Sequence, residues 1–225
     1  MQIIYWFLQQ IRINSCYSFK HMSKFRYVIG KREKANLFLK RLLRFYRKKF
    51  RSSDYLFRGD DEKFKETLQS CKVYAEYGCG KSTIWVAHNT SAKIYSVDTS
   101  KIWVDNVATQ IRDEVQASAL KFIDLGQTGN WGRPLSYRKV DDFHQYTDWI
   151  WKQKPLPDTV LIDGRFRVCC WLTSLKYATP GTKLIFDDYV YRQEYHFVEK
   201  YFLPSGYCGR QAFFVIPEKS KIDLN

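Results

Sequence analysis

The sequence lacks the features that mark several classes of protein. Its N-terminal apolar run, from Ile3 to Leu8, is far shorter than the ~20 residues that span a bilayer. No basic segment precedes this run and no clear cleavage site follows it, so we do not predict a signal peptide. None of the six cysteines forms a Cys-x-x-Cys pair, which is typical of reduced thiols in a cytosolic protein. The chain has no internal repeat and no low-complexity tract.

Acidic residues are scarce in only one part of the chain. Residues 1–53 carry 14 Lys/Arg and a single acid, Glu33, and so hold +13 of the net charge of +14. We call this segment the basic arm and predict a helix over residues 33–50. Such an arm is attracted to anionic surfaces, and we expect an acidic membrane surface as its partner. Nucleic acid is disfavoured because the rest of the chain is nearly neutral. The alternative is a solvated linker helix.

Residues 54–225 are predicted to form one α/β domain. Hydrophobic residues make up 45% of the chain, which excludes a mostly disordered protein. Short apolar segments alternate with helical patterns, and this order predicts a doubly wound, mostly parallel sheet with helices on both faces. We expect strands over residues 72–76, 93–98, 120–125, 159–163, 183–187 and 212–216, with helices over 60–70, 82–89, 101–116, 142–152, 168–178 and 194–202.

The segment after the first strand fits two kinds of ligand-binding loop. Gly80-Lys81-Ser82 matches the end of a phosphate-binding loop, in which backbone N–H groups and a lysine hold phosphate oxygens. Ala75, however, stands where that loop needs its first glycine, and Glu76 would repel a phosphate. The phosphate-loop interpretation therefore explains only part of the segment.

The second interpretation is a loop that binds a nucleoside. Gly78 and Gly80 would let bare backbone and a helix N-terminus approach the ligand. Asp98 ends the next strand 18 residues after Gly80, which suits an acid that hydrogen-bonds ribose hydroxyls. Acids at the strand ends favour a cationic sulfonium over a triphosphate. We therefore prefer this interpretation.

Four motifs in order resemble class I S-adenosylmethionine-dependent methyltransferases with a Rossmann-like fold, over residues 70–216. They are Glu76–Gly80, Val97–Thr99, Thr159–Gly164 and Lys183–Tyr189. The resemblance implies S-adenosylmethionine as the cofactor, with Glu76, Gly78 and Gly80 around its methionine part and Asp98 at its ribose. The full set implied to bind the cofactor is Glu76, Gly78, Cys79, Gly80, Asp98, Thr99 and Asp163.

Two of these motifs, Ile162-Asp163-Gly164 and Phe186-Asp187-Asp188-Tyr189, resemble the macrocin-type sugar O-methyltransferases. That resemblance implies a magnesium ion on Asp163, Asp187 and Asp188, beside a hydroxyl of a sugar or glycan acceptor. A divalent cation would lower the pKa of that hydroxyl. The alternative is a salt-bridged cluster without metal, since Arg165-Phe166-Arg167 follows directly.

Two acids and one histidine are the candidate catalytic residues. Asp163 and Asp188 are the expected catalytic acids, and His196 is a candidate general base for a hydroxyl. The polar loop Gly126–Pro134 has the glycines of a lid, with Trp131 either covering a ligand or packed on the body. Two other functions stay open at this point: a non-catalytic accessory protein with the same fold, and a phosphate-loop nucleotide-binding protein.

Overall fold

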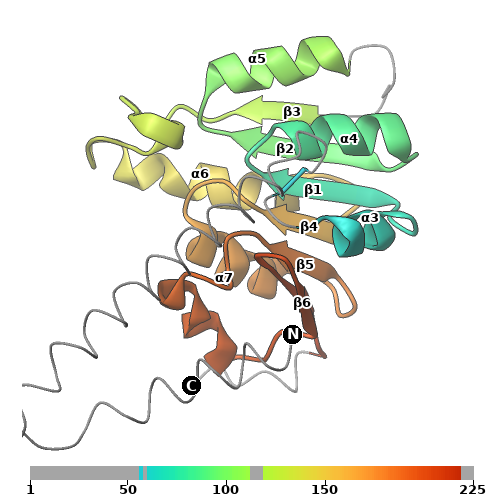
Figure 1. The fold of residues 1–225 in the computed structure, drawn as a ribbon. Coiled ribbons are helices and arrows are strands. Elements are labelled where there is room, and N and C mark those ends of the chain that lie inside the picture. The colour runs from blue at the N-terminus through green and yellow to red at the C-terminus, as the bar shows by residue number, and fades with distance from the viewer. Residues whose placement is uncertain (1–55, 58–59, 112–118, 219–225) are drawn as a thin grey trace, which may run out of the picture. The chain divides into compact units, whose positions relative to one another are not determined.

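The computed structural model describes residues 56–57, 60–111 and 119–218, which form a seven-stranded sheet in the order β3-β2-β1-β4-β5-β7-β6 (Figure 1). Strands β1 to β5 pair in parallel, whereas β7 is antiparallel to both β5 and β6. The strands are β1 Val73–Tyr77, β2 Lys93–Asp98, β3 Ala119–Phe122, β4 Thr159–Ile162, β5 Lys183–Phe186, β6 Gly206–Cys208 and β7 Gln211–Val215. The basic arm and its predicted helix lie outside the described residues.

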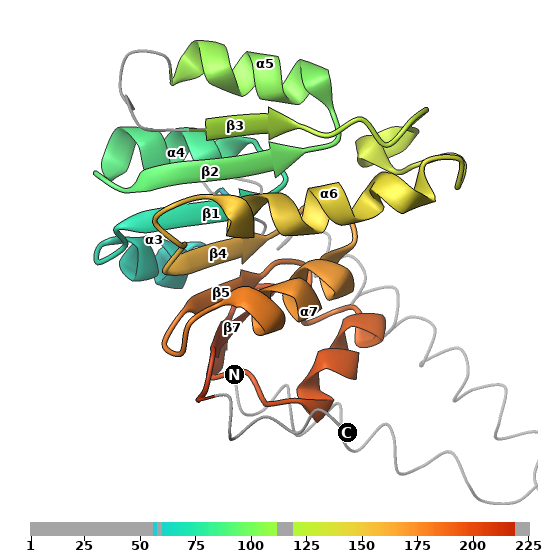
Figure 2. The ribbon, with the colours of Figure 1, turned by 180° about the vertical axis from the view of Figure 1, so that it is seen from behind.

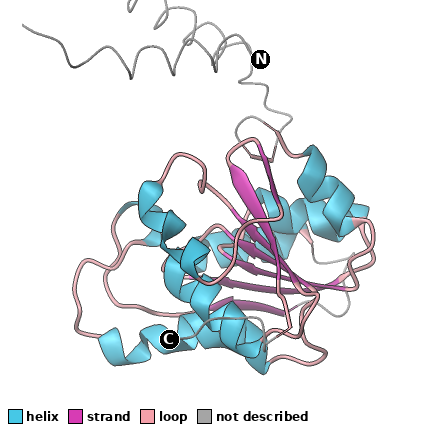
Figure 3. Cartoon of the chain, turned by 90° about the horizontal axis from the view of Figure 1, so that it is seen from below, coloured by secondary structure: helices cyan, strands magenta, loops and turns pink. Residues whose placement is uncertain are grey.

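Helices cover both faces of the sheet, as the uniformly apolar strands predict (Figures 2 and 3). One core layer packs beneath α3 (Glu62–Leu68), α4 (Lys81–Asn89) and α5 (Lys101–Gln110). The other packs beneath α6 (Phe143–Asp148), the 3₁₀ helix η3 (Trp149–Lys152), α7 (Arg167–Tyr177) and the 3₁₀ helix η4 (Gln193–Lys200). The chain therefore adopts the expected Rossmann-like methyltransferase fold.

The structure differs from the expected elements at a few ends. β3 stops at Phe122 rather than at residue 125, because Asp124 turns its carboxylate onto the backbone N–H of Gly126 (2.8 Å) and begins a turn. The helix expected over 142–152 divides into α6 and η3, and the one over 194–202 is the 3₁₀ helix η4. Within the described residues, no helix has both the length and the apolar character that crossing a membrane requires.

Candidate functional site

The loops that follow β1 and β4 touch at two glycines. Gly78 has φ +96°, and a Cβ atom there would lie 2.8 Å from the Cα atom of Gly164. The backbone N–H of Gly164 in turn donates to the carbonyl of Tyr77 (2.5 Å). A residue with a side chain could not adopt this φ and also approach Gly164 so closely, so the contact between the two loops requires glycine at position 78. The glycine loop and the Asp163 loop are thus joined at the carboxyl end of the sheet.

Glu76 is fully buried within a set of four side-chain hydroxyl groups. They belong to Tyr74 (2.8 Å), Ser82 (2.7 Å), Ser96 (2.9 Å) and Thr83, and all four donate to its carboxylate. Burial raises the pKa of Glu76, while these donors act against the rise. The carboxylate ties β1 to β2 and to the start of α4. Protein hydroxyl groups thus bind both carboxylate oxygens, and the place of Glu76 beside the methionine part of the cofactor stays a prediction.

The same contacts remove the phosphate-loop interpretation. The hydroxyls of Ser82 and Thr83 face Glu76 instead of a ligand. The backbone N–H of Gly80 donates to Thr83 Oγ1 (2.9 Å), and Lys81 is exposed at the start of α4. A phosphate loop presents such N–H and hydroxyl groups to its ligand, so this segment does not have that construction.

Asp98 ends β2 beside the glycine loop. Its Oδ2 atom accepts from the backbone N–H of Cys79 (3.0 Å), and its Oδ1 atom accepts from that of Ser100 (2.7 Å). Burial raises the pKa of Asp98, and these N–H donors oppose the rise. The Cys79 thiol is buried, which raises its pKa too. The structure therefore brings Asp98 and the glycine loop together, as the sequence predicts.

Thr99 holds the loop that follows β3. Its hydroxyl donates to the carbonyl of Gly132 (3.0 Å), which lies in the short 3₁₀ helix η1 (Asn130–Gly132). The Thr99 hydroxyl thus binds this loop, and the assignment of Thr99 to cofactor binding stays a prediction. Trp131 is 84% exposed and so is not packed on the body. A second 3₁₀ helix, η2 (Val140–Asp142), follows in the same connection.

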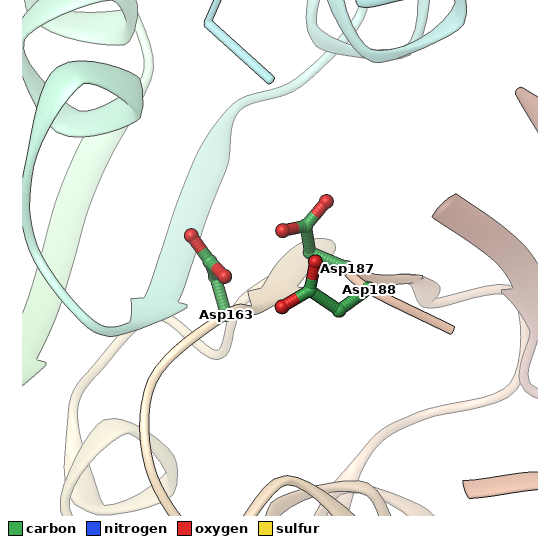
Figure 4. Close-up of side chains that lie close together, drawn as sticks. All are labelled: Asp163, Asp187 and Asp188. Carbon is green, nitrogen blue, oxygen red and sulfur yellow. The ribbon is translucent and has the colours of Figure 1, made fainter. Parts of the chain in front are cut away.

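Three carboxylates converge where β4 and β5 end (Figure 4). Oxygen atoms of Asp163, Asp187 and Asp188 lie within 4.8 Å of one another. Asp187 is fully buried, while the other two are partly exposed. The convergence was expected, because parallel strands place their carboxyl ends at one edge. We call these residues the acidic cluster.

Arginines occupy the acidic cluster. Arg167 donates to Asp163 (2.9 Å) and to Asp188 (3.1 Å). Arg210 donates through Nε to Asp187 (2.9 Å) and also contacts Asp188 (3.0 Å). Burial and the negative charge of Asp187 raise the pKa of Asp163. The salt-bridged alternative thus describes the cluster, although only Arg167 was anticipated. Arg210 was missed because it precedes β7, whose position beside β5 is not evident from the sequence.

Comparison with solved structures places this arrangement in a family. The crystal structure of a methyltransferase-like protein from Silicibacter pomeroyi is 31% identical, with a TM-score of 0.63, and the match covers 70% of this chain and 84% of that one. The chain belongs to the methyltransferase-like proteins of the class I fold. Comparisons with protein-family models and with curated proteins gave no match.

Two other methyltransferase structures are more distant. The N-methyltransferase NodS from Bradyrhizobium japonicum, in complex with S-adenosylhomocysteine, is 12% identical over 74% of this chain and 90% of its own, with a TM-score of 0.48. An RNA methyltransferase from Salinibacter ruber, also in complex with S-adenosylhomocysteine, is 11% identical over 70% and 93%, with a TM-score of 0.44. Likeness at this level carries no inference about the acceptor of this chain.

His196 lies on η4 and contacts Tyr189, the residue that follows Asp188. Its ring stacks on that of Tyr189, with 4.7 Å between centroids, and its Nε2 atom lies 3.2 Å from the Tyr189 carbonyl oxygen. These contacts hold the imidazole on η4. The role of His196 as general base stays a prediction.

Proposed function

We propose that this protein is an S-adenosylmethionine-dependent methyltransferase that holds the cofactor between its glycine loop and Asp98. The contact between the Cys79 N–H and Asp98 Oδ2 supports this most strongly, because it fixes the acid against the loop at the carboxyl end of the sheet. Ligands of open α/β sheets bind at that edge. The methyltransferase-like family supports the same ligand.

The loop also has room for a ligand beside it. A Cβ atom built on Gly80 would meet no other atom within 4 Å, so the backbone there faces open space. Gly80 precedes the nine-residue helix α4. The carboxylate of Asp98 has further lone pairs with which to accept from the two ribose hydroxyls. A cation such as a sulfonium is favoured beside these acids.

Asp163 is the residue we assign to proton transfer. When bound, the cofactor supplies an electrophilic methyl group on a sulfonium. Asp163 would accept the proton of the acceptor hydroxyl when that oxygen is methylated. The Asp163 side chain is 33% exposed, and burial and the negative charge of Asp187 raise its pKa, which makes the carboxylate a stronger base. Asp163 pairs with Arg167, whereas Asp188 contacts three arginines, Arg167, Arg192 and Arg210.

The acceptor we propose is a hydroxyl group, most specifically that of a sugar or glycan. The Ile162–Gly164 and Phe186–Tyr189 motifs support this choice, and the protein would act by positioning and electrostatics. Magnesium does not fit the acidic cluster, because arginine nitrogens already contact all three carboxylates. We therefore assign no step to a metal ion.

Calorimetry tests the cofactor assignment. The full chain should bind S-adenosylmethionine and S-adenosylhomocysteine, and Gly80→Ala should weaken both, because its methyl group enters the ligand space. ATP should give no heat, whereas ATP binding that depends on Lys81 would restore the phosphate-loop alternative. No heat with either sulfur ligand would refute the proposal.

Turnover separates the enzyme from an accessory protein of the same fold. Release of S-adenosylhomocysteine is measured across a panel of sugars and other small hydroxyl compounds. Transfer to a hydroxyl supports the O-methyltransferase, and loss of turnover in Asp163→Asn with retained cofactor binding supports its role as base. Cofactor binding without turnover on any acceptor favours the accessory function.

We also propose that residues 1–53 form a separate segment that attaches the protein to an anionic membrane surface. The charge of +13 on this arm, against a nearly neutral body, supports the proposal. The test is cosedimentation with phosphatidylserine vesicles. Binding should fall as salt rises and vanish on deletion of residues 1–53, and unchanged binding by the deleted form would refute it.

A further inference from the structure

Three carboxylates held within one small volume need positive charge beside them. Asp187 is fully buried, and the desolvation cost of a buried carboxylate is several kcal/mol unless a partner compensates it. Two kinds of partner are available to such a group in proteins, namely a bound cation or a basic side chain. The contacts of the acidic cluster show which one this chain uses.

Arg167 lies at the centre of the acidic cluster. It is the first residue of α7, and its side chain is 7% exposed. Besides its ion pairs with Asp163 and Asp188, its Nη1 atom donates to the carbonyl of Asp187 (2.7 Å) and its Nε atom donates to that of Gly164 (3.1 Å). A single guanidinium group thus binds the loop after β4 and the loop after β5 together.

Arg210 contacts the acidic cluster from the turn between β6 and β7. It lies between β6 and β7, and both Nε and Nη2 donate to the two oxygens of Asp187. Such bidentate pairs are strong and directional. Its Nη1 atom also contacts Asp188 (3.0 Å). Arg192, which is 47% exposed, adds a third and weaker contact with Asp188 (3.3 Å).

The arginines already occupy the carboxylate oxygens that a metal ion would use. Arg167 and Arg210 together contact all three carboxylates, and guanidinium groups stay protonated at all relevant pH values. Magnesium requires several oxygen ligands in near-octahedral geometry, and to bind here it would have to displace buried guanidinium groups. Displacing them would leave buried cations unpaired, which is strongly unfavourable.

We propose that the guanidinium groups of Arg167 and Arg210 are the resident cations of the acidic cluster, in the place where a divalent metal ion would otherwise sit. The cluster then joins the ends of β4 and β5 to the β6–β7 turn and binds no metal. This holds whether or not the protein transfers a methyl group, because it concerns the charge balance of the cluster alone.

Binding of Mn²⁺ by the full chain tests the inference, through loss of the free-ion signal in electron paramagnetic resonance. The wild type should bind Mn²⁺ no more tightly than Asp187→Asn does. Arg167→Met and Arg210→Met each remove one guanidinium group, and each should bind one ion about tenfold more tightly than the wild type. The exposed Arg192→Met serves as the matched control and should behave as the wild type does.

Two outcomes would overturn the inference. One is that the wild type binds one Mn²⁺ ion per chain and that Asp187→Asn abolishes this binding, which would show that a metal ion displaces the arginines. The other is a folded Arg167→Met or Arg210→Met protein that binds no more tightly than Arg192→Met. Should Arg167→Met fail to fold, the wild type and Arg210→Met decide the question. A thermal stabilisation of Arg210→Met by Mn²⁺ that EDTA reverses would give independent support.

Discussion

Gly78 and Gly164 lie so close that neither position has space for a side chain. A Cβ atom on Gly78 would lie 2.8 Å from the Cα atom of Gly164, and one on Gly164 would lie 2.8 Å from the nitrogen of Gly78. The two loops belong to neighbouring parallel strands, β1 and β4. The proposed cofactor loop is therefore set directly against the loop that carries Asp163.

Gly164→Ala should separate these loops. The added methyl group meets backbone atoms of Gly78 and Tyr77, which cannot move aside as a side chain can. We expect the free energy of unfolding in urea to fall by about 1–3 kcal/mol, as overpacking does elsewhere. Gly80→Ala is the control, because a Cβ atom there meets nothing within 4 Å. Equal stability of the two variants would contradict the close approach.

Asp98→Ala should weaken cofactor binding. It removes the acceptor of the Cys79 and Ser100 N–H groups as well as the proposed partner of the ribose. A hydrogen bond to a charged group contributes about 1.5–3 kcal/mol, so we expect affinity for S-adenosylhomocysteine to drop roughly 10–100-fold in calorimetry. Asp105→Ala removes an exposed acid of α5 that pairs with Lys101 on the same helix, and it should bind as the wild type does. Unchanged affinity in Asp98→Ala would refute the ribose role.

Glu76 should make stability depend on pH. Burial raises its pKa in the folded protein, so the folded state binds a proton on the Glu76 carboxyl group more tightly than the unfolded chain does. The stability it contributes is complete below its ordinary pKa and is lost as pH rises through the raised value. The amide group in Glu76→Gln does not ionise over this pH range, so its contribution to stability does not change with pH. The advantage of the wild type over Glu76→Gln, measured by urea unfolding from about pH 4 to 8, should therefore shrink as pH rises. A constant or growing advantage would contradict this.

The Thr99 hydroxyl should restrain the loop that carries Trp131. Thr99→Val removes the hydrogen bond to the Gly132 carbonyl, worth about 0.5–1.5 kcal/mol, and we expect chymotrypsin to cleave after the exposed Trp131 about 2–10 times faster. Thr109→Val is the control, because that hydroxyl donates within α5, to the carbonyl of Asn106. Equal cleavage rates in Thr99→Val and the wild type would show that the hydroxyl does not hold the loop.

Strands and strand-end acids were predictable because both depend on local pattern. Apolar runs such as Val160–Ile162 mark strands covered on both faces, and parallel pairing then brings Asp163 and Asp187 to one edge. Side-chain partners were less predictable. Nothing in the local pattern indicates that Glu76 accepts from Ser96 on another strand. Such contacts depend on strand register and rotamers, which residue types alone do not determine.

The pairing of the C-terminal strands was also not predictable from local sequence pattern. Residues 212–216 were expected as strand material, but nothing local indicates that β7 runs antiparallel to β5. That pairing sets Ala212 against Phe186 and so delivers Arg210 to Asp187. Without it, three acids in two motifs were interpreted as ligands for magnesium. With it, the same acids are partners of arginine.

A crystal structure with S-adenosylhomocysteine tests the central claim most directly. The account predicts the ribose hydroxyls within hydrogen-bond distance of Asp98, the amino-acid part against the backbone of Gly80, and the sulfur atom on the side of Asp163. A ligand bound away from the glycine loop, or one whose ribose does not contact Asp98, would contradict it.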